Sequence, residues 1–424
     1  MPKPAGMALW RTNLACWRRS KPGLPFMNDK YMPSRTTAPI KIGVLYSSTG
    51  VTSLVERTQL QAIQLAIEEI NSAGGALGRE LVLVSLDPAS RPDNYPGMAE
   101  QLILEQGVRL LMGCHMSSTR KAVLPIVERH NALLFYATPY EGFEYSRNVF
   151  YAGAAPNQNI LPLASYMLSH HGTRVAMVGS DYVCPHESNR IMSELIHERG
   201  GEKAHESYLP LHATLDDFRA VAKRIQALSP DFVFSTVVGA GNVHLHRALA
   251  EAGLNPLKAP LASHMCSETD VASIGMDLAE GIITCASYFQ SLDTPENHRV
   301  VARHQARFGA QHSTNVCWEA AYFQTHLIAK ALTQSGSEDP TRLAQVLPGL
   351  EFDAPQGLVR IDGQNNHTYL QPRIGRCNSQ GQFDVLASAA ELVRADPFVV
   401  AHTAPLWTGS AATLRSGSVQ GALP

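Results

Sequence analysis

Strand-like and helix-like patterns alternate along the chain from residue 40 onward. Residues 40–46 are rich in β-branched side chains and end in a loop of serine, threonine and glycine, which predicts a strand. Apolar residues then recur at helical spacing over 60–70 and stop near a glycine pair. Residues 79–87 predict a second strand and 93–106 a second helix. This order predicts a parallel sheet with right-handed crossovers.

The same order repeats after Pro156. Further strands are predicted at 175–182, 203–210, 231–237, 259–263 and 281–286, with helices at 186–199, 216–227 and 243–252. A third region has different content, with helices at 297–308, 318–333 and 341–347 and antiparallel strands at 357–361 and 371–374. The chain is therefore predicted to be an α/β protein with two similar modules in tandem.

Residues 113–145 combine small polar groups and aromatic rings at two turns. Each turn follows an apolar run that is typical of a buried parallel strand, at 108–112 and at 132–136. The carboxyl ends of neighbouring parallel strands meet at one crevice, where ligands bind in doubly wound sheets. The two turns therefore predict a small-molecule site.

Composition narrows the class of protein. The 424 residues suffice for two lobes, and the net charge of -2, from 35 basic and 37 acidic residues, gives no field that would favour nucleic acid or a membrane surface. The seven cysteines are scattered, without a CxxC pair, which suits a reducing compartment. Residues 1–39 lack the uninterrupted apolar core of a secretory signal and are predicted to be a disordered tail. We therefore expect a cytoplasmic protein.

Enzyme motifs are missing from the sequence. There is no GxSxG turn, no phosphate-binding loop and no HExxH helix, and histidines are not grouped at metal-ligand spacing. His115 and Ser117 could form a hydrolytic triad with Asp181, but a serine at such a turn more often caps or donates a hydrogen bond. We expect no enzyme activity, no metal and no cofactor.

Several runs of residues carry a family resemblance: GCHMSSTRKAVLPIVER, YATPYEGFEYS, GAAPNQN, GSDYVCPHESN, FSTVVGAGN and DAPQGLVRI. They resemble the AmiC-type short-chain amide sensors of bacterial amidase operons, over about residues 40–402. That family has the type I periplasmic-binding-protein fold and is related to the urea- and amide-binding components of ABC transporters. The resemblance implies two lobes, each a doubly wound parallel sheet flanked by helices, with the ligand between them.

The resemblance also implies where the chain crosses between the lobes. Lobe one is expected to contain 40–155 and 287–345, and lobe two 156–286 and 346–402. Residues 403–424, which are small and polar, are expected to be a C-terminal tail.

Site residues follow from the same match, taken position by position. Those implied to contact the ligand are Ser117, Tyr136, Thr138 and Pro139 from lobe one and Tyr182 from lobe two. A small amide offers one carbonyl acceptor and two N–H donors, so hydroxyl and backbone groups there suit it. Met116 and Phe135 are expected in the core. His115 and Cys184 stand where the sensors carry tyrosines, and we expect both to border the pocket and to alter its size.

The function implied is that of a cytoplasmic ligand sensor. It would bind a small aliphatic amide or urea-like molecule in the interlobe cleft and negatively regulate an amidase operon by sequestering an RNA-binding antitermination protein. The alternative is the solute-binding subunit of an ABC transporter for urea or short-chain amides, which requires export. The sequence leaves homo-oligomerisation open.

Overall fold

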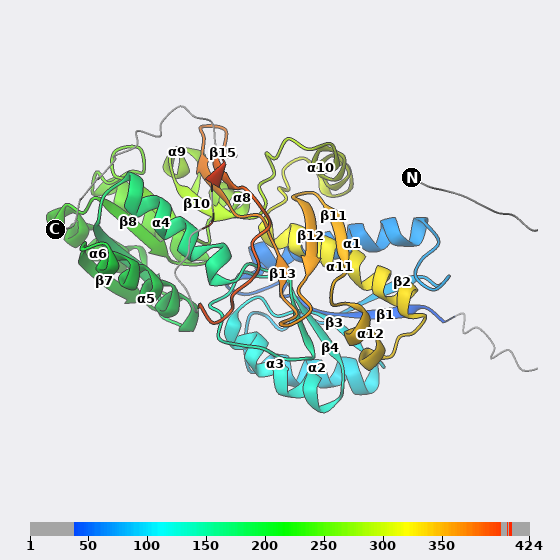
Figure 1. Ribbon diagram of the computed structural model, residues 1–424. Coiled ribbons are helices and arrows are strands. Elements are labelled where there is room, and N and C mark those ends of the chain that lie inside the picture. Colours follow the sequence, from blue (N-terminus) through cyan, green and yellow to red (C-terminus); the bar gives the residue numbers. More distant parts are fainter. Residues whose placement is uncertain (1–37, 400–404, 406, 409–424) are drawn as a thin grey trace, which may run out of the picture. The chain divides into compact units, whose positions relative to one another are not determined.

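The computed structural model describes residues 38–399, 405 and 407–408, so the predicted N-terminal tail lies almost entirely outside the described residues (Figure 1). The first sheet has the spatial order β2 (Leu81–Ser85), β1 (Ile40–Leu45), β3 (Leu110–Gly113), β4 (Leu133–Tyr136), β5 (Val149–Tyr151). Neighbouring strands in it pair in parallel, which confirms the predicted βαβα arrangement.

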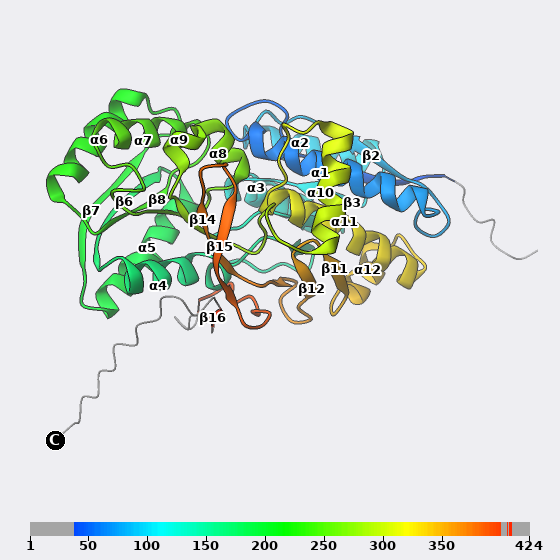
Figure 2. The same ribbon diagram turned by 90° about the horizontal axis from the view of Figure 1, so that it is seen from above.

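Helices cover both faces of the first sheet because its strands are apolar on both sides. Ile40, Ile42 and Val44 share a core with α1 (Ser53–Ser72), α10 (Pro295–Phe308), α11 (Val316–Ser335) and α12 (Pro340–Val346). Leu45 and Leu111 face the other way, toward α2 (Asn94–Glu100), the π-helical turn Gln101–Glu105 and α3 (Ser117–Arg129). Figure 2 shows the yellow α11, from late in the chain, beside the blue α1.

The second sheet mixes parallel and antiparallel strands. Its order is β16 (Trp407–Thr408), β15 (Phe383–Ala389), β14 (Arg373–Cys377), β10 (Ile283–Ala286), β9 (Leu261–Ser263), β8 (Phe232–Thr236), β6 (Arg174–Ser180), β7 (Glu202–Leu209). β14 pairs antiparallel with both β10 and β15, as the sequence predicted for 371–374. β16 falls inside the expected C-terminal tail, so the backbone there is paired to β15 rather than free.

Helices also cover both faces of the second sheet. One face carries α4 (Ile160–His170) and α5 (Val183–Glu198), and the other carries α6 (Leu215–Leu228), α7 (Ala240–Glu251), α8 (Glu268–Ile274) and α9 (Met276–Ala279). The architecture is therefore a two-lobed α/β fold, each lobe built on a largely parallel sheet between helices.

A separate antiparallel sheet lies between the last helices and β14. It consists of β11 (Glu351–Ala354), β12 (Gly357–Ile361) and β13 (Thr368–Tyr369). Its buried residues, with Leu347 and Leu370, join the core around β1 and α11. We had expected residues 346–402 in lobe two, whereas this core places the segment up to Leu370 with the first sheet.

Asn315 precedes α11 and its side chain joins three helices. Its Oδ1 accepts hydrogen bonds from the backbone N–H groups of Cys317 and Trp318, both at 2.9 Å, and so caps α11. Its Nδ2 donates to Thr58 Oγ1 of α1 at 2.9 Å and to Thr269 Oγ1 of α8 at 2.8 Å. Because α1 covers the first sheet and α8 the second, this amide connects the two lobes.

Glu319 of α11 is a buried carboxyl whose titration should lower stability at alkaline pH. Burial raises its pKa to about 8, although Gln356 Nε2 donates to it at 2.7 Å. Because the folded protein holds a proton that the unfolded chain releases above pH 5, stability falls as the pH rises through this pKa.

We expect Glu319→Gln to remove part of the alkaline loss of stability. Between pH 7 and 8.5 the free energy of unfolding of the wild type should fall by about 1 kcal/mol more than that of the variant. Buried histidines contribute in the opposite direction, but mainly below pH 7, where the unfolded chain still binds their protons. Urea unfolding across this range measures the difference, with the exposed Glu351→Gln as control. Parallel curves for wild type and Glu319→Gln would contradict the assignment.

Candidate functional site

The seven side chains that the sequence indicated border one cavity between the lobes. Its lining comprises Thr52, His115, Met116, Ser117, Tyr136, Thr138, Pro139, Tyr182, Cys184, Val238 and Met265. The cavity measures about 20 Å³, room for roughly one or two water-sized groups. Contact with a ligand stays a prediction for each of them. Their convergence follows from the fold, because β3 and β4 end side by side and α5 begins on the opposite lobe.

His115 forms part of a neutral hydrogen-bond cluster. Its Nδ1 lies 3.2 Å from Gln59 Oε1 and 3.3 Å from Thr138 Oγ1. Gln59 Nε2 in turn donates to the Ala137 carbonyl at 3.0 Å, which fixes its Oε1 as the atom that faces the histidine. Burial lowers the pKa of His115 to about 4, so the ring is neutral at pH 7. Since Gln59 Oε1 can only accept, Nδ1 carries the proton and Nε2 is left as an acceptor.

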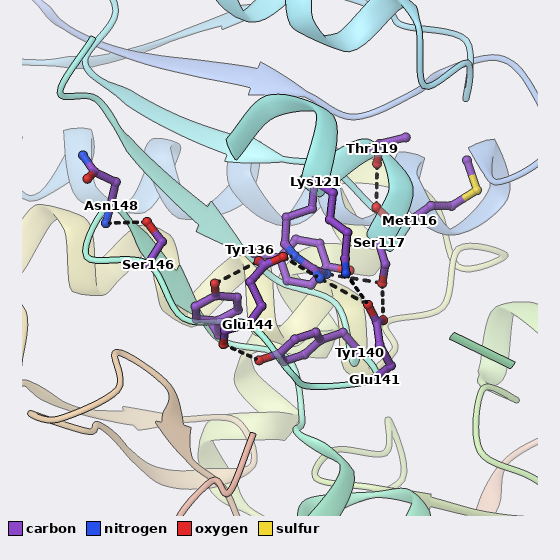
Figure 3. Close-up of polar contacts among 12 residues, drawn as sticks. Met116, Ser117, Thr119, Lys121, Tyr136, Tyr140, Glu141, Glu144, Ser146 and Asn148 are labelled. Carbon is purple, nitrogen blue, oxygen red and sulfur yellow. Dashed lines mark hydrogen bonds and ion pairs between the residues drawn. The ribbon is translucent and has the colours of Figure 1, made fainter. Parts of the chain in front are cut away.

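Ser117 begins α3 and already has two partners, as Figure 3 shows for its bond to Glu141. Its hydroxyl donates to Glu141 Oε2 and accepts from Arg120 Nη1 at 3.3 Å. Hydroxyl and backbone groups were both expected to meet the ligand here, but the Ser117 hydroxyl cannot donate to a ligand carbonyl while it donates to Glu141. The Ser117 and Ser118 amides lie in the first turn of α3 and have no intrahelical acceptor, so they can take that role.

Arg120 lies behind Ser117 and is fully buried. Its Nε donates to Glu144 Oε1 at 2.7 Å, and its Nη2 lies 3.5 Å from Glu141 Oε1. Its guanidinium carbon is 4.6 Å from the ring centres of both Tyr136 and Tyr140. The neighbouring carboxylates and the Tyr136 hydroxyl keep the pKa of Arg120 above its usual value despite burial. This network supports the lobe-one wall of the cavity.

Tyr136 contributes a ring rather than a free hydroxyl. The ring is buried, and its hydroxyl donates to the His115 carbonyl at 2.8 Å. Figure 3 shows the ring among Glu144, Ser117 and Tyr140. Tyr136 therefore presents its ring to the cavity, and its contact with a ligand stays a prediction.

Tyr182 and Cys184 form the lobe-two wall at the start of α5. Tyr182 is partly exposed, and desolvation of its hydroxyl raises its pKa. Burial also raises the pKa of the Cys184 thiol to about 12, so this thiol stays protonated. The predicted helix began at His186, three residues later than it does. Pro185 is the signal that could have corrected this, because proline favours the first helical turn.

Four lining residues escaped the sequence prediction. Thr52 follows β1, Val238 follows β8 and Met265 follows β9. Met116 was expected in the core but borders the cavity, whereas Phe135 is a core residue as expected. Apolar side chains of this kind carry no chemical signal by which sequence alone could separate lining from core.

A family model described as "Periplasmic binding protein domain" matches residues 40–404. The chain belongs to this periplasmic-binding-protein family. One similar protein is the Leu/Ile/Val-binding protein homolog 6 of Brucella suis biovar 1, 24% identical over 337 residues that cover 77% of this chain and 85% of that protein. A solute binding protein of an ABC transporter from Rhodopseudomonas palustris HaA2, in complex with p-hydroxybenzoic acid, has a TM-score of 0.78. It is 23% identical and covers 86% of this chain and 100% of its own, which shows the shared fold.

One shorter match of this periplasmic binding protein is to a protein that is named as an enzyme. A segment is 32% identical over 126 residues to limonene hydroxylase of Geobacillus stearothermophilus, and it covers 30% of this chain and 23% of that protein. Within the described residues the hydrolytic triad considered above is not assembled. Asp181 pairs with His186 at 2.9 Å, and His115 bonds to Gln59 rather than to Ser117.

The cavity lining of this periplasmic binding protein carries no arginine, lysine, aspartate or glutamate among the described residues. Arg120 is close by, but Glu141 and Glu144 already neutralise it. No group of histidines, cysteines and carboxylates in the described part of the chain could hold a metal ion. The described cysteines are all free. The cavity therefore offers neutral hydrogen-bonding groups and protonated thiol rather than charge.

No helix in the described ranges is both long enough and apolar enough to span a bilayer.

Proposed function

We propose that this protein binds a small neutral amide or urea-like molecule between its lobes and acts as a solute-binding protein of the ABC-transporter type. One observation carries the proposal: neutral polar side chains from both lobes surround a cavity of about 20 Å³. A ligand that contacts both lobes favours the closed form by its higher affinity for that form.

The free groups of the cavity match an amide. Its carbonyl can accept from the first-turn amides of α3, at Ser117 and Ser118. Its N–H groups can donate to His115 Nε2 and to the Tyr182 hydroxyl. Because a buried polar group left unpaired costs about 1–3 kcal/mol, a molecule that lacks either kind of group should bind poorly.

A charged ligand fits the cavity less well. The relatives named above are called a Leu/Ile/Val-binding protein homolog and a p-hydroxybenzoate complex, and both kinds of molecule carry a carboxylate at neutral pH. In this chain no lining residue offers a cation to pair with that carboxylate, since Arg120 is engaged by two glutamates. Burying an unpaired charge is costly. We therefore favour a neutral ligand over an amino acid or a benzoate.

The biological setting has two candidates. The names of the relatives favour a solute-binding subunit that delivers its ligand to a permease. The motifs around TRKAV and TPYEGFEYS favour the second candidate, a cytoplasmic amide sensor that sequesters an RNA-binding antitermination protein. In both settings the same closure around a neutral ligand would change the surface offered to a protein partner.

Purification from native cells, with and without acetamide, separates the two settings. Permease subunits in the purified complex support the transporter setting. An RNA-binding protein that acetamide releases supports the sensor. Fractionation that places the protein outside the cytoplasm would exclude the sensor.

The Tyr182→Phe variant tests the ligand site. Removing the hydroxyl of the Tyr182 side chain, which can accept from an amide N–H, should weaken acetamide binding about three- to ten-fold, as measured by titration calorimetry. The matched control is Tyr145→Phe, because Tyr145 is 50% exposed and does not line the cavity. Binding of leucine or 4-hydroxybenzoate, together with no detectable binding of acetamide or urea, would overturn the proposal.

A further inference from the structure

A larger cavity adjoins the one just described. We refer to the cavity of about 20 Å³ as the inner cavity and to its neighbour, of about 80 Å³, as the outer cavity. Both are bordered by Thr52, His115, Pro139, Val238 and Met265. Because one set of side chains borders both, the two cavities lie next to each other.

The outer cavity is mainly apolar and is contributed by both lobes. Val51, Leu54 and Val55 come from the loop before α1 and from its first turn. Val243 of α7 and Val316 of α11 also line the outer cavity. Val51 and Leu54 are 48% and 52% exposed, so apolar surface at this mouth faces water when no ligand covers it.

Several polar groups in the outer lining already have hydrogen-bond partners. Asp270 accepts from the Ser267 hydroxyl at 2.7 Å and from Asn242 Nδ2 at 3.2 Å. The Thr269 hydroxyl accepts from Asn315 Nδ2 at 2.8 Å. These groups therefore do not require a polar partner from a ligand, whereas His264 Nδ1 and Thr284 Oγ1 in the same lining have no partner among the described residues. Most of the remaining surface is apolar and comes from the valines and Leu54.

We propose that the outer cavity holds an unbranched aliphatic chain whose neutral amide head occupies the inner cavity. The ligand is then a medium-chain amide rather than acetamide or urea. The outer volume corresponds to roughly five to eight water-sized groups, which suits a chain of about four or five carbons beyond the head. This inference rests on the proposed function, because the inner cavity supplies the recognition of the head.

Chain length should therefore control affinity. Transfer of one methylene from water to an apolar site is worth about 0.8 kcal/mol, which corresponds to about a four-fold gain in affinity. We expect each methylene from acetamide to hexanamide to tighten binding by about that factor. The gain should stop once the outer cavity is filled, so decanamide should bind no better than hexanamide.

Calorimetry on the full chain with the series acetamide, butanamide, hexanamide and decanamide tests this inference. Val243→Phe should fill the outer cavity and remove the gain between acetamide and hexanamide. Val385→Phe is the control, since Val385 is 40% exposed on β15 and borders neither cavity. It should keep the full gain.

The outcomes separate this inference from the proposed function. Acetamide binding with no gain for the longer amides would overturn the chain site and leave the neutral-ligand proposal standing. A gain that Val243→Phe leaves intact would also overturn it, because the chain would then lie elsewhere. If no amide of the series binds, both proposals fail.

Discussion

Replacing Arg120 by methionine should cost the folded protein about 3–5 kcal/mol, the usual penalty for breaking a buried ion pair by removing one partner. Arg120 is fully buried, and the side chains of Glu141 and Glu144 are 2% and 9% exposed. Methionine has a similar length but leaves both carboxylates without their buried cation, and Glu141 keeps only the half-exposed Lys121 at 3.8 Å. The substitution also removes the guanidinium stacked between the rings of Tyr136 and Tyr140.

Restoring charge balance should recover much of that loss. The triple variant Arg120→Met, Glu141→Gln, Glu144→Gln replaces the ionic network by neutral groups and should be more stable than Arg120→Met alone. Arg219→Met serves as the surface control, since Arg219 pairs with Glu251 on the outside of the protein, and exposed ion pairs contribute little. Guanidinium unfolding measures all three variants. Arg120→Met within 1 kcal/mol of wild type would show that the network is dispensable.

Gly239→Ala should weaken ligand binding about ten-fold or more by obstructing contact between the lobes. Gly239 precedes α7 at a φ of +61°, and an added Cβ would lie 2.9 Å from the Val51 carbonyl oxygen of the opposite lobe. Real Cβ atoms do not approach a backbone oxygen so closely, so the lobes would have to separate. Every contact that a ligand makes with both lobes would then be strained or lost.

A second glycine isolates that effect from backbone strain. Gly253 has a φ of +78°, and an added Cβ there meets nothing within 4 Å. Both alanine variants should therefore lose about 1 kcal/mol of stability from the unfavourable φ, but only Gly239→Ala should lose acetamide affinity. Calorimetry measures the affinity for acetamide, and small-angle scattering with saturating acetamide measures the closure of the lobes. Equal affinities for the two variants would contradict a close lobe contact at Gly239.

The convergence of the site could be predicted because it depends on strand order alone. Ser117 and Thr138 follow strands that neighbour each other in a parallel sheet, so the sheet brings them together. The family resemblance added Tyr182 from the opposite lobe, which periodicity could not have supplied. The start of α5 was placed three residues late, although Pro185 carried the necessary signal.

The buried ion-pair network behind the site could not be predicted from strand order. Arg120, Glu141 and Glu144 look like exposed charges in a helix and a loop, and only the packing of Tyr136 and Tyr140 over them makes them buried. The assignment of residues 347–370 failed for a related reason. Short antiparallel strands carry little information about which of two cores they cover, and here α11 provides the surface on which they pack.

Opening of the lobes should cost little free energy at the Asn315 side chain. Its bonds to Thr58, Cys317 and Trp318 all stay within elements that cover the first sheet, whereas the bond to Thr269 reaches the second lobe. When the lobes part, this residue exchanges one hydrogen bond for one with water and keeps the others. We therefore expect the cap that Asn315 makes on α11 to be the same in the open and the closed molecule.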